Sequence, residues 1–290
     1  MIKELQIVEK KSANRRPDWL RVKLPSGEKF KEVLDTINEH KLNTVCSEAR
    51  CPNMGECWGA GTATFMILGD VCTRSCAFCA VKTGRPQADL DWDEPRRVAD
   101  AAAKMKLKHV VLTSINRDDR RDGGAPIFAA THTALRETIP GVTIESLIPD
   151  FKGIWEALQM VLDTPPDVLS HNLETVPSKY RRVRPQARYE RSLELLKRTK
   201  DAGIKSKTGI MVGLGETREE VIELMQDCVD HHVDVLTIGQ YMQPTKMHHP
   251  VLDWVHPDQF NEYKEIGERL GIGHVESGPL VRSSYHAERH

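Results

Sequence analysis

The sequence has no excess of charge of one sign and no long hydrophobic run. Its 290 residues contain 41 Lys and Arg against 42 Asp and Glu, and the resulting net charge of -1 gives no electrostatic reason to expect nucleic-acid binding. No apolar stretch approaches the roughly 18 residues that indicate a membrane-spanning helix. The start of the chain, MIKELQIVEKK, lacks the apolar core of a secretion signal. We therefore expect a cytoplasmic protein that binds neither a membrane nor nucleic acid.

The cysteine pattern does not fit a disulfide framework. The chain has seven cysteines, an odd number, and six of them fall between Cys46 and Cys79. Such crowding is typical of metal ligands in a reducing compartment. Cys228 stands apart on a helical pattern, where we expect a buried apolar residue. The six clustered cysteines are therefore candidate metal ligands.

From residue 63 onward, short apolar runs alternate with amphipathic segments of helical period. The runs cover residues 64–69, 109–115, 142–149, 167–174, 207–215 and 235–242. Helices are predicted at 28–40, 94–106, 126–138, 152–162, 189–202, 217–230 and 257–270, and residues 272–281 form a last strand or a closing loop. Six strand-helix units predict an α/β fold with a parallel sheet, either doubly wound or an incomplete barrel. Both place their active sites at the C-terminal ends of the strands.

Three cysteines follow the first predicted strand on one short loop. Cys72, Cys76 and Cys79 have C-x3-C-x2-C spacing. Iron-sulfur clusters usually take four cysteines, so three would leave one iron open to another ligand. Phe78, between the second and third cysteines, would shield such a cluster from water. These three thiols alone also permit a zinc site.

A second cysteine group precedes that strand. Cys46, Cys51 and Cys57 have C-x4-C-x5-C spacing and lack the C-x2-C pair that is common in zinc sites. Together, CSEARCPNMGECW and CTRSCAFC resemble the lipoyl synthase family of the radical S-adenosylmethionine (SAM) superfamily, and the resemblance runs from residue 17 to residue 286. It implies a partial (β/α)6 TIM-type barrel whose N-terminal and C-terminal extensions carry an auxiliary cluster. We expect the parts to be residues 1–60, 61–271 and 272–290.

The cofactors implied by the resemblance are SAM and two 4Fe-4S clusters. The catalytic cluster, which cleaves SAM to a 5′-deoxyadenosyl radical, is matched by Cys72, Cys76 and Cys79. The auxiliary cluster, which donates sulfur, is matched by Cys46, Cys51, Cys57 and a serine of the RSSYH motif at residues 282–286, for which we choose Ser283 over Ser284. A hydroxyl is a harder ligand than a thiolate, so Ser283 should be the easiest ligand to lose.

Two further segments match the family near strand ends. In SHNLETV, residues 170–176, we expect Asn172 and Glu174 to hydrogen-bond to SAM, with a capping turn as the alternative. In LTSINRDDRRDGGA, residues 112–125, Gly123 and Gly124 would let the backbone approach SAM, with a helix start as the alternative. Asn116 stands where the family motif has Asp. Five arginines are candidates for binding a carboxylate or an acidic partner, unless they form a solvated face: Arg181, Arg182, Arg184, Arg188 and Arg191.

The implied reaction is the insertion of two sulfur atoms at carbons 6 and 8 of a protein-bound octanoyl-lysine group, which gives the lipoyl cofactor. The implied partners are octanoylated carrier domains of 2-oxoacid dehydrogenase complexes or the glycine cleavage H protein, and an electron donor such as ferredoxin or flavodoxin. The alternatives are a methylthiolating radical enzyme that acts on tRNA or another protein, and a non-catalytic iron-sulfur or zinc protein. Mass gain on an octanoylated carrier and metal content would distinguish them.

Overall fold

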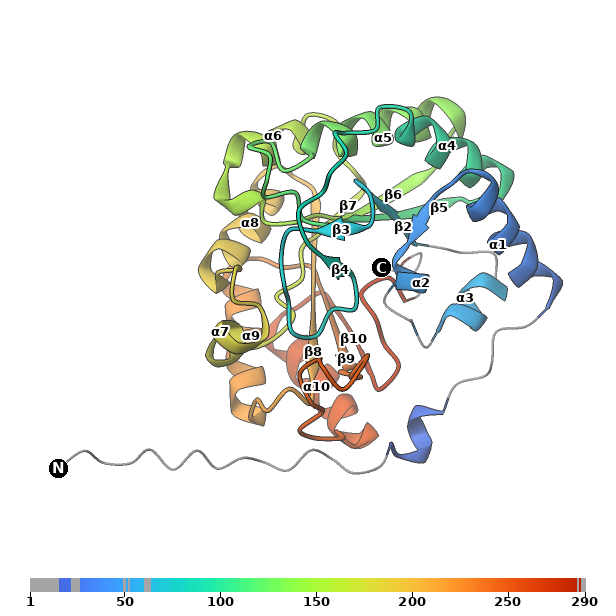
Figure 1. Cartoon of the computed structure of the whole chain (residues 1–290). Coiled ribbons are helices and arrows are strands. Elements are labelled where there is room, and N and C mark those ends of the chain that lie inside the picture. Colours follow the sequence, from blue (N-terminus) through green and yellow to red (C-terminus); the bar gives the residue numbers. More distant parts are fainter. Residues whose placement is uncertain are drawn as a thin grey trace.

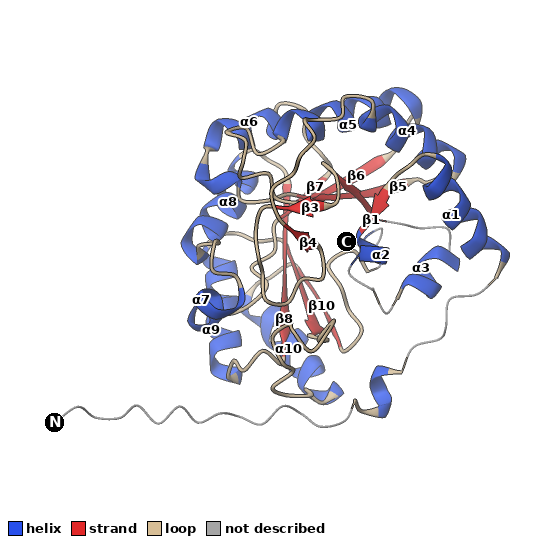
Figure 2. Ribbon diagram, in the orientation of Figure 1, coloured by secondary structure: helices blue, strands red, loops and turns tan. Residues whose placement is uncertain are grey.

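The computed structural model describes residues 16–21, 27–48, 51, 53–59, 64–285 and 287. Among these residues, a curved eight-stranded sheet lies inside an arc of helices (Figure 1 and Figure 2). The strand order is β1-β2-β5-β6-β7-β8-β9-β10, and every neighbouring pair except β1 and β2 is parallel. The first part of the expected N-terminal extension, the expected boundary at residues 60 and 61, and His286 lie outside the described residues.

The six predicted strands are confirmed, and residues 274–278 add a seventh strand parallel to them. They are β2 (Thr64–Ile67), β5 (His109–Ser114), β6 (Thr143–Leu147), β7 (Val168–Ser170), β8 (Lys205–Val212), β9 (Val235–Gln240) and β10 (His274–Gly278). Most of their residues are buried, as expected for a parallel sheet covered by helices on one face and enclosed on the other. The order ends at β1 and β10, so the partial barrel that the family resemblance implied is confirmed as an open one.

The predicted helices are also confirmed. They are α4 (Glu94–Lys104), α5 (Ala125–Thr138), α6 (Trp155–Leu162), α8 (Tyr189–Asp201), α9 (Arg218–Asp230) and α10 (Pro257–Leu270). Helix α6 begins at Trp155 because a short 3-10 turn, Phe151–Gly153, comes first, and the Asp150 side chain caps that turn. No helix of the described residues is long and apolar enough to cross a membrane.

The described part of the N-terminal extension attaches to the β2 edge. It contains a 3-10 turn (Asp18–Leu20), α1 (Glu28–Glu39), β1 (Asn43–Thr44), α2 (Val45–Glu48) and α3 (Met54–Gly59). Strand β1 pairs antiparallel with β2, and the Phe30 ring of α1 stacks on Trp58 of α3 at 5.0 Å between centroids. The chain after β10 returns to this region, where Leu280 contacts Asn53 and Tyr285 contacts Glu56 of α3. The described parts of the N-terminal and C-terminal segments therefore meet at one edge of the sheet.

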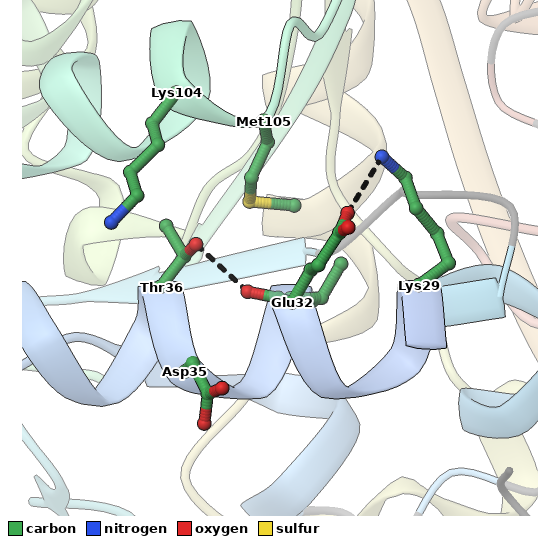
Figure 3. Close-up of a pocket in the computed structure, with 7 residues that line it drawn as sticks. Lys29, Glu32, Asp35, Thr36, Lys104 and Met105 are labelled. Atoms are coloured by element: carbon green, nitrogen blue, oxygen red, sulfur yellow. Dashed lines mark hydrogen bonds and ion pairs between the residues drawn. The ribbon is translucent and has the colours of Figure 1, made fainter. Parts of the chain in front are cut away.

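A surface hollow of about 300 Å³ lies between α1 and α4 (Figure 3). Both lysines of the hollow are already paired, since Lys29 contacts Glu32 at 3.2 Å and Lys104 contacts Glu39. The hollow is lined by Lys29, Glu32, Val33, Asp35, Thr36, Lys104 and Met105. No cysteine is among these described lining residues, so the hollow is separate from both cysteine groups.

Candidate active site

The loop that bears Cys72, Cys76 and Cys79 is closed at its base by two short strands. Strand β3 (Val71–Cys72) pairs in parallel with β4 (Lys82–Thr83), and the Gly84 amide donates to the Cys72 carbonyl at 2.9 Å. At its far end, the Ala77 amide donates to the carbonyl of Val183 at the end of α7 (Tyr180–Val183), at 2.8 Å. The loop is thus held between the segment after β2 and the segment after β7.

The three thiols of this loop are half-buried and close to one another. Burial raises the pKa of Cys76 to about 11 and that of Cys79 to about 12. Cys72 Sγ accepts two backbone amides, from Arg74 at 3.4 Å and from Asn116 at 3.3 Å. Amides directed at a cysteine sulfur stabilise a thiolate that ligates a cluster. The donor set and its hydrogen bonds therefore fit an iron-sulfur cluster.

Among the described residues, no three His, Cys, Asp or Glu side chains converge as they would on a single metal ion. A zinc ion bonds each cysteine sulfur at about 2.3 Å, which crowds its ligands together. In a 4Fe-4S cluster each cysteine ligates its own iron, so the ligand sulfurs lie farther apart. Cys72, Cys76 and Cys79, which do not converge on one metal ion, are therefore compatible with the larger group.

A cavity of about 120 Å³ opens beside this loop at the C-terminal ends of β5, β6 and β7. It is lined by Arg74, Thr113, Ser114, Asn116, Leu147, Ile148, Pro149, Asp150, His171, Asn172, Glu174 and Arg184. Four of its polar atoms are buried without a hydrogen-bond partner within the described part of the chain: Ser114 Oγ, Asn116 Oδ1, Asn172 Oδ1 and Arg184 Nε. Buried polar groups without a partner are costly, so they indicate a polar ligand. SAM, with its ribose, amino and carboxylate groups, fits these donors and acceptors.

The sequence prediction placed Asn172 and Glu174 in this region, and the structure brings both to the cavity wall. Asn172 Nδ2 donates to Glu174 Oε1 at 3.1 Å, and burial raises the pKa of Glu174. Glu174 has φ of 65° and bridges to Ile210 of β8. Gly209 of β8 has no side chain, and a Cβ there would lie 3.1 Å from Asn172 Oδ1. Backbone and packing thus orient these two polar groups together.

Arg184 is the arginine that the sequence could not distinguish from its neighbours. Arg181, Arg182 and Arg188 are exposed, whereas Arg184 is 7% exposed and lies beside the cavity. Its Nη1 donates to the carbonyls of Asn172 at 2.7 Å and Leu173 at 3.0 Å. These bonds direct a cation toward the Cys76 thiol, although burial is the larger influence on that thiol's pKa and raises it. Arg184 therefore joins the candidate SAM-binding residues.

Gly123 and Gly124 are required by the backbone whether or not SAM touches them. Their φ values are 57° and 84°, in the left-handed region that favours glycine. A Cβ on Gly123 would lie 2.7 Å from Phe151, and one on Gly124 would collide with Leu68. Neither glycine is among the described residues that line the cavity. Their contact with SAM stays a prediction.

The second cysteine group lies on α2, on α3 and on the segment between them, near the β1 edge of the sheet. Cys46 lies in α2, Cys57 lies in α3, and Cys51 joins them, with its amide donating to the Cys46 carbonyl at 2.9 Å. Burial raises the pKa of both Cys46 and Cys51. The predicted ligand Ser283 is half-buried in the tail that follows β10. The fold thus brings the three cysteines and Ser283, which lie far apart in the sequence, to the same edge of the barrel.

Two hydrogen bonds fasten this tail to the cysteine helix α3 and to Asn53, the residue before it. Asn53 Nδ2 donates to the carbonyl of Leu280 at 2.7 Å, and Tyr285 Oη donates to Glu56 Oε1 at 3.1 Å. Burial raises the pKa of Tyr285 to about 12, and the nearby Glu56 adds to this rise. Ser283 lies between these two attachment points. Its predicted ligand role is therefore compatible with the path of the tail.

Comparison with known proteins agrees with the two cysteine groups. A family model for the radical SAM superfamily matches residues 66–228, and a model for the N-terminal domain of lipoyl synthase matches residues 2–51. The mitochondrial lipoyl synthase of Nematostella vectensis is 55% identical over 276 residues, which are 95% of this chain and 94% of that protein. The lipoyl synthase of Rubrobacter xylanophilus is 55% identical over 281 residues, covering 96% of this chain and 87% of its own.

Solved structures share the fold at low sequence identity. SuiB of Streptococcus suis, bound to S-adenosylmethionine, has a TM-score of 0.56 at 16% identity and covers 75% of this chain. HydG, a maturase of the FeFe hydrogenase, has a TM-score of 0.57 at 13% identity over 85% of this chain. The chain spans 52% and 62% of those two structures. The full-length identity to curated relatives decides between the alternatives left by the cysteine spacing. The chain belongs to the lipoyl synthase family of the radical SAM superfamily.

Proposed function

We propose that the two cysteine groups, Ser283 and the residues of the cavity carry the family's reaction in this chain. As a radical SAM sulfurtransferase, the chain inserts two sulfur atoms at carbons 6 and 8 of a protein-bound octanoyl-lysine group, using SAM and two 4Fe-4S clusters. We assign the catalytic cluster to Cys72, Cys76 and Cys79. We assign the auxiliary cluster to Cys46, Cys51, Cys57 and Ser283. The assignment of the first site is carried by one observation, the four unpartnered polar atoms in the cavity beside Cys72.

When bound, the cofactors supply the 5′-deoxyadenosyl radical and the sulfur, because no side chain is basic enough to remove a proton from an unactivated carbon. The residues of the chain bind, orient and exclude water. Asn172 Oδ1 and the Glu174 carboxylate would accept hydrogen bonds from the hydroxyl and amino groups of SAM. Arg184 would pair with its carboxylate, since a guanidinium in a buried site favours an anion.

The auxiliary site is assembled from both ends of the chain. We propose that residues 1–60 and 272–290 act together on it, while residues 61–271 form the radical SAM barrel. Because Ser283 is carried by a tail that two hydrogen bonds attach, it can leave without unfolding the barrel. A weak hydroxyl ligand on a detachable tail suits a cluster that must be dismantled to release sulfur.

The substrates of lipoyl synthases imply a lipoyl carrier protein as partner. We propose octanoylated carrier domains of 2-oxoacid dehydrogenase complexes or the glycine cleavage H protein, with ferredoxin or flavodoxin as electron donor. The exposed Arg181 and Arg182 next to the cysteine loop support an acidic partner surface. We also propose a cytoplasmic location, because six clustered thiol ligands require a reducing compartment.

The test is anaerobic turnover on an octanoyl-lysine peptide, read by mass for one and two added sulfur atoms. The wild-type chain should give both products, and Cys72→Ala should abolish SAM cleavage. Ser283→Ala should keep SAM cleavage but lose most sulfur insertion, whereas the matched control Ser284→Ala should resemble the wild type. Full lipoyl product from Ser283→Ala, or a defect confined to Ser284→Ala, would refute the assignment of Ser283.

A further inference from the structure

The two amides that reach the Cys72 sulfur come from different loops. One belongs to Arg74, inside the cysteine loop, and the other belongs to Asn116, in the segment after β5. An amide can point at a sulfur only while its loop keeps its place. The two loops must therefore be held together for both hydrogen bonds to persist.

A set of contacts joins the two loops directly beside Cys72. The Arg74 side chain donates through Nε to Asp118 Oδ2 at 2.7 Å and through Nη2 to Asp118 Oδ1 at 3.0 Å. The Asp118 amide donates to Thr73 Oγ1 at 3.0 Å, and the Thr73 amide and hydroxyl donate to the Asn116 carbonyl at 3.1 and 3.0 Å. A two-pronged guanidinium-carboxylate contact fixes both distance and orientation. Arg74 and Asp118 therefore set the positions of both amides.

A second carboxylate, that of Asp150, also binds the Arg74 side chain. Asp150, which is fully buried, accepts from Arg74 and also from Arg191 Nη1 of α8 at 3.1 Å. Two arginines thus face two aspartates, Asp118 and Asp150, so the charges balance inside the barrel mouth. Removing one member of a buried set leaves an uncompensated charge, which the remaining groups relieve by moving. The position of the cysteine loop is therefore sensitive to each pair.

Resting on the proposed function of Cys72, we propose that the Arg74–Asp118 pair is a positioning device that keeps two amides on the Cys72 sulfur and so raises the reduction potential of the cluster bound there. Hydrogen bonds to cluster sulfurs stabilise the more negative, reduced state. Asp118 is not among the described residues that line the cavity, so its effect acts through the loop and not through a contact with SAM.

The same loop supplies a matched control. Arg117 is as buried as Arg74 and forms an equivalent two-pronged pair with Asp119, at 3.0 and 2.9 Å. This pair contacts the Ala88 carbonyl, not the cysteine loop. Asp118→Asn and Asp119→Asn therefore make the same chemical change one residue apart. The first alters the proposed positioning pair, and the second alters a pair that does not bind the cysteine loop.

The experiment is a redox titration of the fully reconstituted chain, followed by electron paramagnetic resonance. The catalytic cluster is identified as the signal that changes when SAM is added. Asp118→Asn should make reduction at least tenfold less favourable, a negative shift of about 59 mV for one electron. Asp119→Asn should keep the wild-type potential. Arg74→Lys, which keeps the charge but loses the fork, should give an intermediate shift.

An unchanged potential in Asp118→Asn, or an equal shift in Asp119→Asn, would overturn the proposal. If Asp118→Asn does not retain four irons at this site, Arg74→Lys decides, and a wild-type potential there overturns it equally. A wild-type chain without a SAM-responsive signal would instead refute the assignment of Cys72, Cys76 and Cys79. The two failures are therefore distinguishable.

Discussion

The attachment of the C-terminal tail to α3 makes a prediction about the auxiliary cluster. Asn53 is 4% exposed, and its side-chain amide donates to the Leu280 carbonyl at 2.7 Å. Asn53→Ala removes this donor while leaving Cys46, Cys51 and Cys57 in place. Leaving a buried acceptor without its donor costs about 1 to 3 kcal/mol. If this cost falls on the form whose tail is attached to α3, the form with a detached tail becomes roughly 5 to 150 times more populated.

The assay is the anaerobic release of iron to a chelator from the reconstituted chain without SAM. Release from the auxiliary cluster should accelerate in proportion to the detached population, whereas release from the catalytic cluster should keep its wild-type rate and serves as an internal reference. Asn38→Ala, an exposed position on α1, is the matched control and should change neither rate. Wild-type release from an Asn53→Ala chain that begins with a full complement of iron would refute the link between this hydrogen bond and ligand retention.

Three further predictions concern the cavity, a glycine and two histidines. Glu174→Gln should weaken SAM binding about tenfold or more, since a hydrogen bond to a charged group contributes about 1.5 to 3 kcal/mol, and calorimetry with unchanged iron content checks this. Gly124→Ala should lower the free energy of unfolding by about 1 to 3 kcal/mol more than Gly141→Ala, because both have positive φ but only the first meets a neighbour, Leu68; equal urea midpoints would contradict this. Burial lowers the pKa of His132 and His171 to about 4, so between pH 6.5 and 4 the unfolded chain binds more protons. As the pH falls through this range, the free energy of unfolding of the cluster-free chain should therefore decrease by roughly 1.4 kcal/mol per pH unit for each histidine. A free energy of unfolding that does not change with pH would contradict this.

The strands and helices of the barrel were predictable because each is encoded locally. Apolar runs of strand length and helical periodicity depend on neighbouring residues, and every predicted run from residue 64 to residue 242 became a strand. The segment at 272–281 remained open because its few apolar residues fit a strand or a loop. It became β10 through pairing with β9, a contact that its own residues do not encode.

Asn116 illustrates a residue whose place in the structure does not follow from its type. It departs from the family motif, yet its structural contacts are made by the backbone: the amide donates to Cys72 Sγ and the carbonyl accepts from Thr73. Many residue types can make backbone contacts of this kind, so these contacts do not depend on the residue type at position 116, whereas the Asn116 side chain faces the cavity. Arg184 is the opposite case, because nothing in a run of five arginines indicates which one is buried.

The sequence by itself determined the alternating strand-helix order, the two cysteine groups and the family, because these depend on residue type and spacing along the chain. Only the tertiary structure decided that the tail bearing Ser283 lies against α3, more than 220 residues earlier in the chain, through the Asn53–Leu280 and Glu56–Tyr285 contacts. It also decided that Arg74, Asp118 and Asp150 meet under the Cys72 loop. Contacts of this kind depend on how distant segments pack, and hydrogen-bond partners carry no signal in the spacing of either residue.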